Sequence, residues 1–244
     1  MLHKIEELSL NAWPSLQTVI YDGWILRFAE GYTRRANSIS PLYPSQMDLE
    51  EKVRHCEGLY GQQNLPVIFK LAGRDESGEL DQYLGARGYH DEAYTSVQVA
   101  DLNSWQAQVD SGLKFSDSLD DAWEKAFSSM HLLDNRQRQI HMRMVNSIVP
   151  PKTFVWQRKD EQIIGCALGV LQDGYLGIFD VIIDREFRGR GYGESLMRGL
   201  LSWGKTNEAH TAYLQVMVDN EPALGLYHKL GFREAYVYWY RVKE

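Results

Sequence analysis

The chain has 244 residues, of which 44% are hydrophobic and 24% charged, which is the composition of an ordinary globular protein. Its formal net charge of −7 disfavours a general nucleic-acid binder, because such proteins are usually basic. The two cysteines, Cys56 and Cys166, are too few for a disulfide framework and lack the spacing of metal ligands, so we expect reduced thiols and no metal.

The start of the chain carries no signal for export or membrane insertion. Its first ten residues mix charged and apolar side chains, without the continuous apolar core of a signal peptide. No stretch approaches the roughly 18 uncharged apolar residues that span a bilayer. We therefore expect a cytoplasmic protein that does not bind membranes. From its acidic charge we expect no nucleic-acid partner, and we expect a monomer or a homodimer.

The N-terminal half predicts short strands and helices. A hairpin is expected around Glu30-Gly31, and its second strand contains the unusually polar segment 34–38. Asn37 in this segment is a candidate contact for an acceptor substrate, or else part of a solvated hairpin. The expected elements are strands 18–30 and 32–41, helix 49–60, strand 66–71, helix 80–84 and strand 93–99.

A domain boundary is expected near residue 110. The residues Asp110, Ser111 and Gly112 form a turn signal after the last strand of the N-terminal half. The chain then divides into a smaller N-terminal domain, residues 1–110, and a C-terminal domain, residues 111–244.

The C-terminal half gives the clearer pattern. Ser118 is expected to cap its first helix, and Gly231 to stop its last one. Three strands joined by short turns form an antiparallel meander between these helices. In chain order the expected elements are helices 118–130 and 135–148, strands 153–157, 162–171 and 175–183, helix 194–205, strand 210–218, helix 221–230 and strand 232–242.

A glycine-rich loop joins strand 175–183 to the helix that follows it. Glycines let backbone N–H groups turn inward as an anion nest, and the first turn of the helix adds N–H donors and a favourable dipole. The spacing matches neither the GxGxxG of dinucleotide folds nor a Walker A loop. The pattern favours a pyrophosphate site, with a tight turn that binds nothing as the alternative. The loop consists of Arg188, Gly189, Arg190, Gly191, Tyr192 and Gly193.

Two segments, one in each half, are similar to each other. Residues 80–89 and 226–232 each contain a short helix, a Leu-Gly pair and an aromatic residue that opens a strand. The pair is Leu84-Gly85 in the first segment and Leu230-Gly231 in the second. The similarity suggests a diverged internal repeat, with a chance match as the alternative.

A second motif follows the glycine loop by about thirty residues. It comprises Asn220, Ala223, Leu226, Tyr227, Lys229, Leu230, Gly231 and Phe232. Together with the pattern Arg188-x-x-Gly191-x-Gly193, it resembles the acetyl-CoA motifs of the GCN5-related N-acetyltransferases, the GNAT superfamily. The order of the elements expected from residue 113 onward is also similar to that of the family, so the resemblance covers about 130 residues.

The resemblance implies a mixed α+β GNAT fold, in which helices flank a mostly antiparallel twisted sheet, with a smaller and degenerate GNAT-like N-terminal half. It also implies an enzyme that moves an acetyl group from acetyl-CoA to an amine by direct attack, and a small-molecule acceptor rather than a protein. The loop amides would hold the pyrophosphate, and the main chain of the strand edge from Asp180 to Ile183 would hold the pantetheine arm. The cofactor-binding residues would be Val181, Ile182, Ile183, Arg188, Gly189, Arg190, Gly191, Tyr192, Gly193, Glu194, Asn220, Ala223 and Tyr227.

Tyr227 occupies the position of the general acid in this family. An unperturbed tyrosine has a pKa of about 10, so the hydroxyl is protonated at neutral pH and can donate to a leaving thiolate. An aromatic core residue is the alternative. Asn220 either orients the pantetheine arm or caps the last helix. Arg188 and Arg190 either supply charge to the pyrophosphate or are simply solvated.

The general base stays unassigned. Asp180 either binds or deprotonates an amine acceptor, or is a polar residue at a sheet edge. The histidines at positions 131, 141, 210 and 228 are expected to be structural or exposed. Two further functions remain open: a CoA-binding sensor without chemistry, and an acyltransferase with another acyl donor or acceptor.

Overall fold

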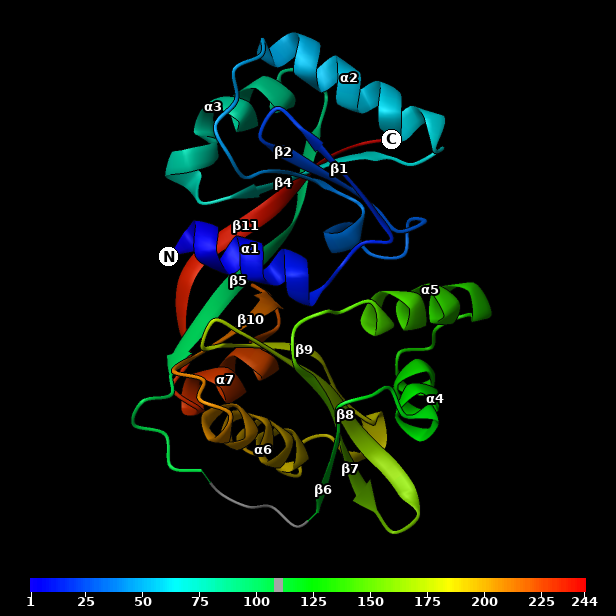
Figure 1. Cartoon of the computed structure of the whole chain (residues 1–244), viewed down its shortest axis with the longest axis vertical. Helices are drawn as coiled ribbons and strands as arrows, with labels where there is room; N and C mark the ends of the chain where they lie inside the picture. The colour runs from blue at the N-terminus through cyan, green and yellow to red at the C-terminus, as the bar shows by residue number, and fades with distance from the viewer. Residues whose placement is uncertain (108–111) are drawn as a thin grey trace. The chain divides into compact units, whose positions relative to one another are not determined.

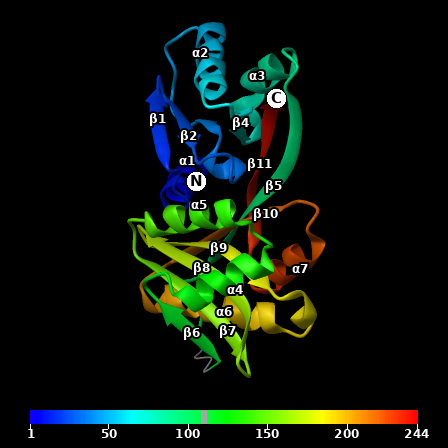
Figure 2. The same cartoon turned by 90° about the vertical axis from the view of Figure 1, so that its right-hand side faces the viewer.

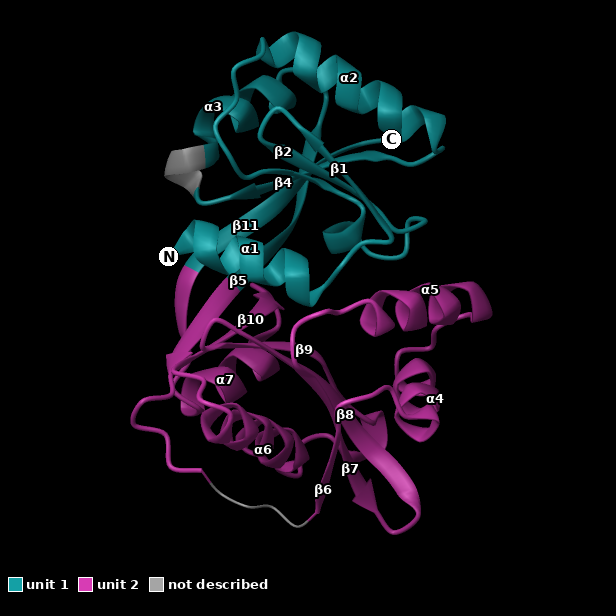
Figure 3. Ribbon diagram, viewed as in Figure 1, with its two compact units in different colours: residues 1–96, 236–244 teal, residues 97–235 magenta. Residues whose placement is uncertain are grey.

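The computed structural model describes residues 1–107 and 112–244, and the side chains of these ranges except those of residues 74–76. The chain forms two compact units (Figure 3). Unit 1 comprises residues 1–96 and 236–244, and unit 2 comprises residues 97–235. The boundary expected between residues 110 and 111 lies outside the described residues. No helix of the described ranges is long and apolar enough to cross a membrane.

Unit 1 builds a sheet in the order β1-β2-β3-β4-β11 (Figure 1). The β3–β4 pair is parallel, and the other neighbours in this series are antiparallel. Its core includes Trp24, Tyr60 and Phe69, which are almost fully buried. The elements are α1 Leu2–Ala12, β1 Gln17–Tyr21, β2 Trp24–Phe28, η1 Arg34–Ala36, β3 Ile39–Pro41, α2 Leu49–Gln62, β4 Val67–Ala72, α3 Arg74–Gly85, the start of β5 His90–Asp101 and the end of β11 Arg233–Lys243.

The first hairpin of unit 1 differs from the expected one. Its tight turn is Asp22-Gly23, where both residues have positive φ angles of 42° and 82°. This geometry is typical of a two-residue hairpin and explains the Asp-Gly pair. The polar segment expected as a strand forms the 3-10 helix η1 Arg34–Ala36 instead. Helix α1 was not expected from the sequence.

Unit 2 builds a sheet in the order β10-β9-β8-β7-β6, in which only the β9–β10 pair of this series is parallel. Helices α6 and α7 cover one face of it, and α4 and α5 cover the other (Figures 1 and 2). The elements are β6 Leu113–Ser116, α4 Asp121–Met130, α5 Asn135–Asn146, β7 Lys152–Lys159, β8 Gln162–Gln172, β9 Tyr175–Ile183, η2 Arg185–Phe187, α6 Tyr192–Thr206, β10 Thr211–Met217 and α7 Glu221–Lys229.

The structure confirms the mixed α+β class and most elements of the C-terminal half. Helix α6 lies on the sheet through Leu196, Met197, Leu200 and Leu201, all fully buried, as its spacing predicts. Two details differ. Strand β6 was not expected, and α4 is capped by Asp120 rather than by Ser118. The Asp120 carboxylate accepts from the backbone N–H groups of the first turn, which shortens the helix at its start.

Candidate active site

The glycine loop leads into α6 without a side chain that caps the helix. Gly191 occupies the N-cap position in a left-handed conformation with φ 84°, and Gly189 has φ 72°. A Cβ atom at either glycine would meet nothing within 4 Å, so the backbone here faces open space. Gly193 is packed more closely, because its Cβ would lie 3.4 Å from Leu226 of α7. The loop therefore offers accessible N–H donors at the positive end of a helix of 15 residues.

The charged side chains of the loop lie around this opening. Arg188 is exposed, and its Nε donates to the carbonyl oxygen of Ile183 at 2.9 Å, which ties the loop to the end of β9. The guanidinium of Arg190 lies 5.7 Å from the centre of the Phe187 ring. Glu194 accepts from Arg198, one turn further along α6, so its negative charge is balanced within the helix. The surroundings of the loop favour an anion.

Strands β9 and β10 pair over only part of their lengths. Their parallel register joins residues 175–178 to residues 211–214, whereas β9 continues to Ile183 and β10 to Met217. On its other side, β9 remains paired with β8 at Ile182 and Ile183 after an irregularity in the register. The main chain of Val181 and its neighbours therefore has one side available to an extended, amide-bearing ligand.

Tyr227 lies on α7, next to the end of β9. Its side chain is buried in the cluster against which Val181, Ile183 and Ala223 pack, and its ring centre lies 5.9 Å from that of Phe232. Burial raises the pKa of Tyr227 to about 12. None of the described residues hydrogen-bonds its hydroxyl. The group is a protonated donor at neutral pH and is held in a low-dielectric environment.

Asn220 stands at the start of the same helix. Its Oδ1 accepts from the backbone N–H of Ala223 at 3.3 Å, and Pro222 follows in the first turn. The structure thus shows Asn220 as the cap of α7, which is one of the two roles expected for it. The cap fixes the beginning of the helix that carries Tyr227.

Asp180 meets a histidine on the opposite face of the sheet. Its Oδ2 lies 2.9 Å from Nε2 of His141, whose side chain on α5 is fully buried. The imidazole stacks on Phe127 with ring centres 4.5 Å apart and an angle of 17°. His141 was expected to be structural or exposed. Its place beside Ile140 on the buried face of α5 could have indicated that His141 is buried. The sequence did not indicate Asp180 as its partner.

An ion pair with a buried carboxylate holds α4 and α5 together beside this histidine. Glu124 is 1% exposed and accepts from Nε of Arg138 at 2.6 Å, while a second guanidinium nitrogen contacts the other carboxylate oxygen. Ser128 also donates to this carboxylate at 2.7 Å. Because a bidentate pair has a narrow geometry, it fixes the two helices relative to each other and with them the ring of His141.

Asn37, expected to contact an acceptor, lies in unit 1 and is 3% exposed. Its Oδ1 accepts from the backbone N–H groups of Ala29 and Gly31 at 2.7 and 2.9 Å, and its Nδ2 donates to the carbonyl of Thr33 at 2.7 Å. The amide group is thus used by its own loop, and we assign Asn37 no role with a substrate.

Comparison with protein families gives a match over nearly the whole chain. A family described as "Probable histone acetyltransferase Rv0428c C-terminal" matches residues 2–241. The chain is also similar to "Uncharacterized N-acetyltransferase YobR" of Bacillus subtilis (strain 168). The two are 27% identical over 249 residues, which cover 99% of this chain and 98% of that relative.

Solved structures share the fold at low sequence identity. A GCN5-related N-acetyltransferase from Kribbella flavida superposes with a TM-score of 0.73 and 12% identity, over 100% of this chain and 95% of that one. A tandem GNAT protein from the clavulanic acid biosynthesis pathway superposes with a TM-score of 0.66 and 14% identity, over 98% of this chain and 87% of that one. The likeness extends over both units.

Proposed function

Because the chain belongs to the Rv0428c C-terminal family, within the GNAT superfamily of N-acetyltransferases, we propose that it transfers an acetyl group from acetyl-CoA to a small-molecule amine. The observation that carries the choice of donor is the uncapped glycine loop of α6, which opens beside the diverging ends of β9 and β10. The loop would bind the pyrophosphate of the donor, and the unpaired edge of β9 would bind its peptide-like arm, so the two features are needed close together.

The residues around the loop fit this donor. The backbone of residues 188–194 would hold the pyrophosphate, with Arg188 and Arg190 adding positive charge. The main chain of Val181, Ile182 and Ile183 would pair with the pantetheine arm like an added strand. Ala223 and Asn220 lie at the capped start of α7, and the buried Tyr227 of this helix would lie at the inner end of this path.

The proposed reaction is a direct attack on the thioester that acetyl-CoA supplies. The amine nitrogen forms a bond to the carbonyl carbon, the carbon–sulfur bond breaks, and the sulfur takes up a proton. Tyr227 donates to this sulfur. Since the raised pKa of its hydroxyl lies above the value of about 8.5 of an ordinary thiol, the group acts chiefly by stabilising the developing thiolate. The proton released by the amine balances the one that the sulfur finally keeps.

Two measurements on the intact chain test the proposal. Acetyl-CoA should raise the thermal midpoint, because a ligand of the native state stabilises it. Release of free thiol over a panel of amines, with a peptide N-terminus included, should then identify an acceptor. The absence of a thermal shift at millimolar acetyl-CoA would overturn the choice of donor. Binding without turnover of any amine would favour a CoA-binding sensor instead.

We further propose that unit 1 is a degenerate copy of the GNAT fold. In both units a hairpin, a third strand, a helix, a parallel strand and a second helix follow one another in the same order. The tandem GNAT protein that superposes over 98% of this chain supports this interpretation. The smaller copy would then serve the fold and the acceptor rather than the donor.

A further inference from the structure

An aspartate in a left-handed conformation interrupts β9 where this strand separates from β10. Asp180 has φ 53°, and the register between β8 and β9 shifts opposite it. The last parallel pair of β9 with β10 is Ile178–Leu214, two residues earlier. Bulges of this kind redirect a side chain, and strained backbone at non-glycine residues is concentrated at functional sites. The bulge turns the Asp180 carboxylate toward α5, while the next residue, Val181, packs against the cluster that holds Tyr227.

We propose that Asp180 is the base that accepts the proton of the amine substrate, and that His141 positions its carboxylate. The inference rests on the proposed acetyl transfer. It differs from the sequence-based expectation in adding His141, and in giving Asp180 one role in place of two alternatives. Tyr227 and Asp180 then act from opposite faces of the sheet. Tyr227 is the proton donor at the sulfur, and Asp180 is the proton acceptor at the nitrogen.

The contacts of His141 suit a positioning residue. The imidazole is fully buried, stacked on Phe127, and carried by a helix that the Glu124–Arg138 pair fixes to α4. With Nε2 protonated, the ring donates to Oδ2 of Asp180 at 2.9 Å, and the second carboxylate oxygen is the one that would accept the proton of the substrate. A buried carboxylate and imidazole are costly for folding unless they bond each other, and their pairing here removes most of that cost.

The proton transfer balances without any further reactant. An aliphatic amine with a pKa near that of lysine, about 10.4, arrives as an ammonium ion, which a carboxylate attracts. The ammonium ion gives one proton to the oxygen of Asp180, and the freed lone pair forms the new nitrogen–carbon bond. The carbon–sulfur bond breaks, the nitrogen releases its second proton, and the sulfur takes up one, so these two protons balance. Asp180 returns its proton to solvent after the product leaves. The other charged or titratable groups that act on the pair or its surroundings are His131, Glu124, Cys166 and Arg188.

Asp180→Asn and Asp180→Gly test the base, since both residues tolerate a left-handed backbone. Each variant should keep the thermal shift with acetyl-CoA and lose turnover by about 100-fold, the usual contribution of a positioned base. A wild-type enzyme that turns over no amine overturns the proposed function. An active wild type together with a fully active Asp180→Asn variant overturns only the assignment of the base.

His141→Gln and His141→Leu test the positioning role. Glutamine can place an N–H donor near the position of Nε2, so His141→Gln should retain most of kcat and the acidic limb of the pH profile of kcat/KM. His141→Leu removes the donor and should lower kcat and shift that limb. Equal activity losses in both variants with unchanged pH profiles, at equal thermal midpoints, would mean that His141 is only a structural residue and would overturn this role.

Discussion

Corresponding loops of the two units differ in whether a carboxylate of the protein occupies the N–H groups at the start of the following helix. In unit 2 the loop before α6 ends in Gly191, and no side chain caps the helix. In unit 1 the loop before α2 ends in Asp48, whose carboxylate accepts from the backbone N–H groups of Glu50 and Glu51 in the first turn of the helix. One helix start is open to an external anion, and the other is closed by the protein itself.

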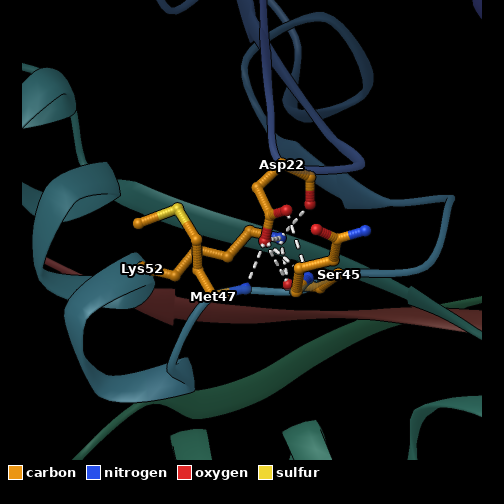
Figure 4. Close-up of polar contacts among 5 residues, drawn as sticks. Asp22, Ser45, Met47 and Lys52 are labelled. Carbon is orange, nitrogen blue, oxygen red and sulfur yellow. Dashed lines mark hydrogen bonds and ion pairs between the residues drawn. The ribbon is translucent and has the colours of Figure 1, made fainter.

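A second carboxylate fills the loop of unit 1 (Figure 4). Asp22, from the β1–β2 turn, accepts from the hydroxyl of Ser45 at 2.5 Å, from the backbone N–H groups of Gln46 and Met47 at 3.1 and 3.0 Å, and from the buried ammonium of Lys52 at 3.1 Å. These are the kinds of donor that hold a phosphate in other proteins. The protein's own side chain thus supplies the anion that unit 1 binds.

The helices that follow the parallel strands carry different side chains at corresponding positions. After α7, the N–H of Phe232 donates to the carbonyl of Tyr227, and Gly231 has φ 90°; after α3, the N–H of Tyr89 donates to the carbonyl of Leu84, and Gly88 has φ 84°. These equal bonding patterns place Leu84 where unit 2 has Tyr227. Unit 1 keeps the scaffold of the second helix and lacks the hydroxyl, which shows that a shared fold does not imply shared chemistry.

Removal of one hydroxyl group should give the largest effect. Tyr227→Phe is expected to lower kcat by about 100-fold while leaving the affinity for acetyl-CoA nearly unchanged. Tyr89→Phe, at the corresponding helix end of unit 1, is the control, because its hydroxyl bonds Glu57 and should affect only stability. Steady-state thiol release and a binding titration measure the two parameters. A Tyr227→Phe variant with full turnover would remove the proposed difference between the two helices.

The next largest effect should come from alanine substitution at one of two glycines that have the same φ angle. Gly191 and Gly88 both have φ 84°, and a Cβ at either would meet nothing within 4 Å. Alanine should therefore cost each position about 1 kcal/mol of stability through backbone strain. Only Gly191→Ala should also weaken acetyl-CoA binding, by about 10-fold if one hydrogen bond to the pyrophosphate is lost. Similar affinities in both variants would argue against the loop as the pyrophosphate site.

Stoichiometry provides a direct test of the closed loop. Isothermal titration of the intact chain with acetyl-CoA should give one binding event per chain, because Asp48 and Asp22 occupy the donors of unit 1. Two equivalent binding events would contradict this comparison. The titration needs no variant and can be made before an acceptor is known.

The smallest expected effect concerns stability at acidic pH. Hydrogen bonds from Ser45 and the Met47 N–H hold the pKa of Asp22 below its ordinary value of about 3.9. The stabilisation from Asp22 is therefore present above this pH and is lost as the pH falls through the folded-state pKa. Asp22→Asn should have a lower thermal midpoint than the wild type at neutral pH, and the difference should shrink below about pH 4. Asp160→Asn, at a positive-φ turn of the β7–β8 hairpin, is the control and should show no such trend.

The sequence predicted the local structure of the candidate site wherever that structure depends on residues close together in the chain. The loop and helix α6 follow from the glycine spacing, and the place of Tyr227 follows from its motif. The sequence comparison paired Gly85 with Gly231, whereas the structure pairs Gly88, because only Gly88 has the positive φ that ends α3 in the same way. A repeated Leu-Gly pair carries no information about backbone angles.

Contacts between distant segments were beyond prediction. His141 and Asp180 are 39 positions apart and meet only because the fold brings α5 to the bulge of β9. The contact between Asp22 and Lys52 likewise depends on the loop of residues 45–47 folding over the β1–β2 turn. Aspartate and lysine are usually exposed and histidine is intermediate, so composition alone gave no reason to expect these buried pairs. Three-dimensional packing converts them into paired groups.

Strand β11 has a consequence for the order in which the chain can fold. Its residues 238–243 pair with residues 67–72 of β4 and complete the sheet of unit 1. During synthesis the ribosome makes all of unit 2 before this strand emerges. The sheet of unit 1 therefore cannot be completed until then. The edge of β4 stays uncovered, although the other strands of unit 1 are synthesised first. Removal of residues 236–244 should leave unit 2 able to fold while exposing β4 to aggregation or to chaperones.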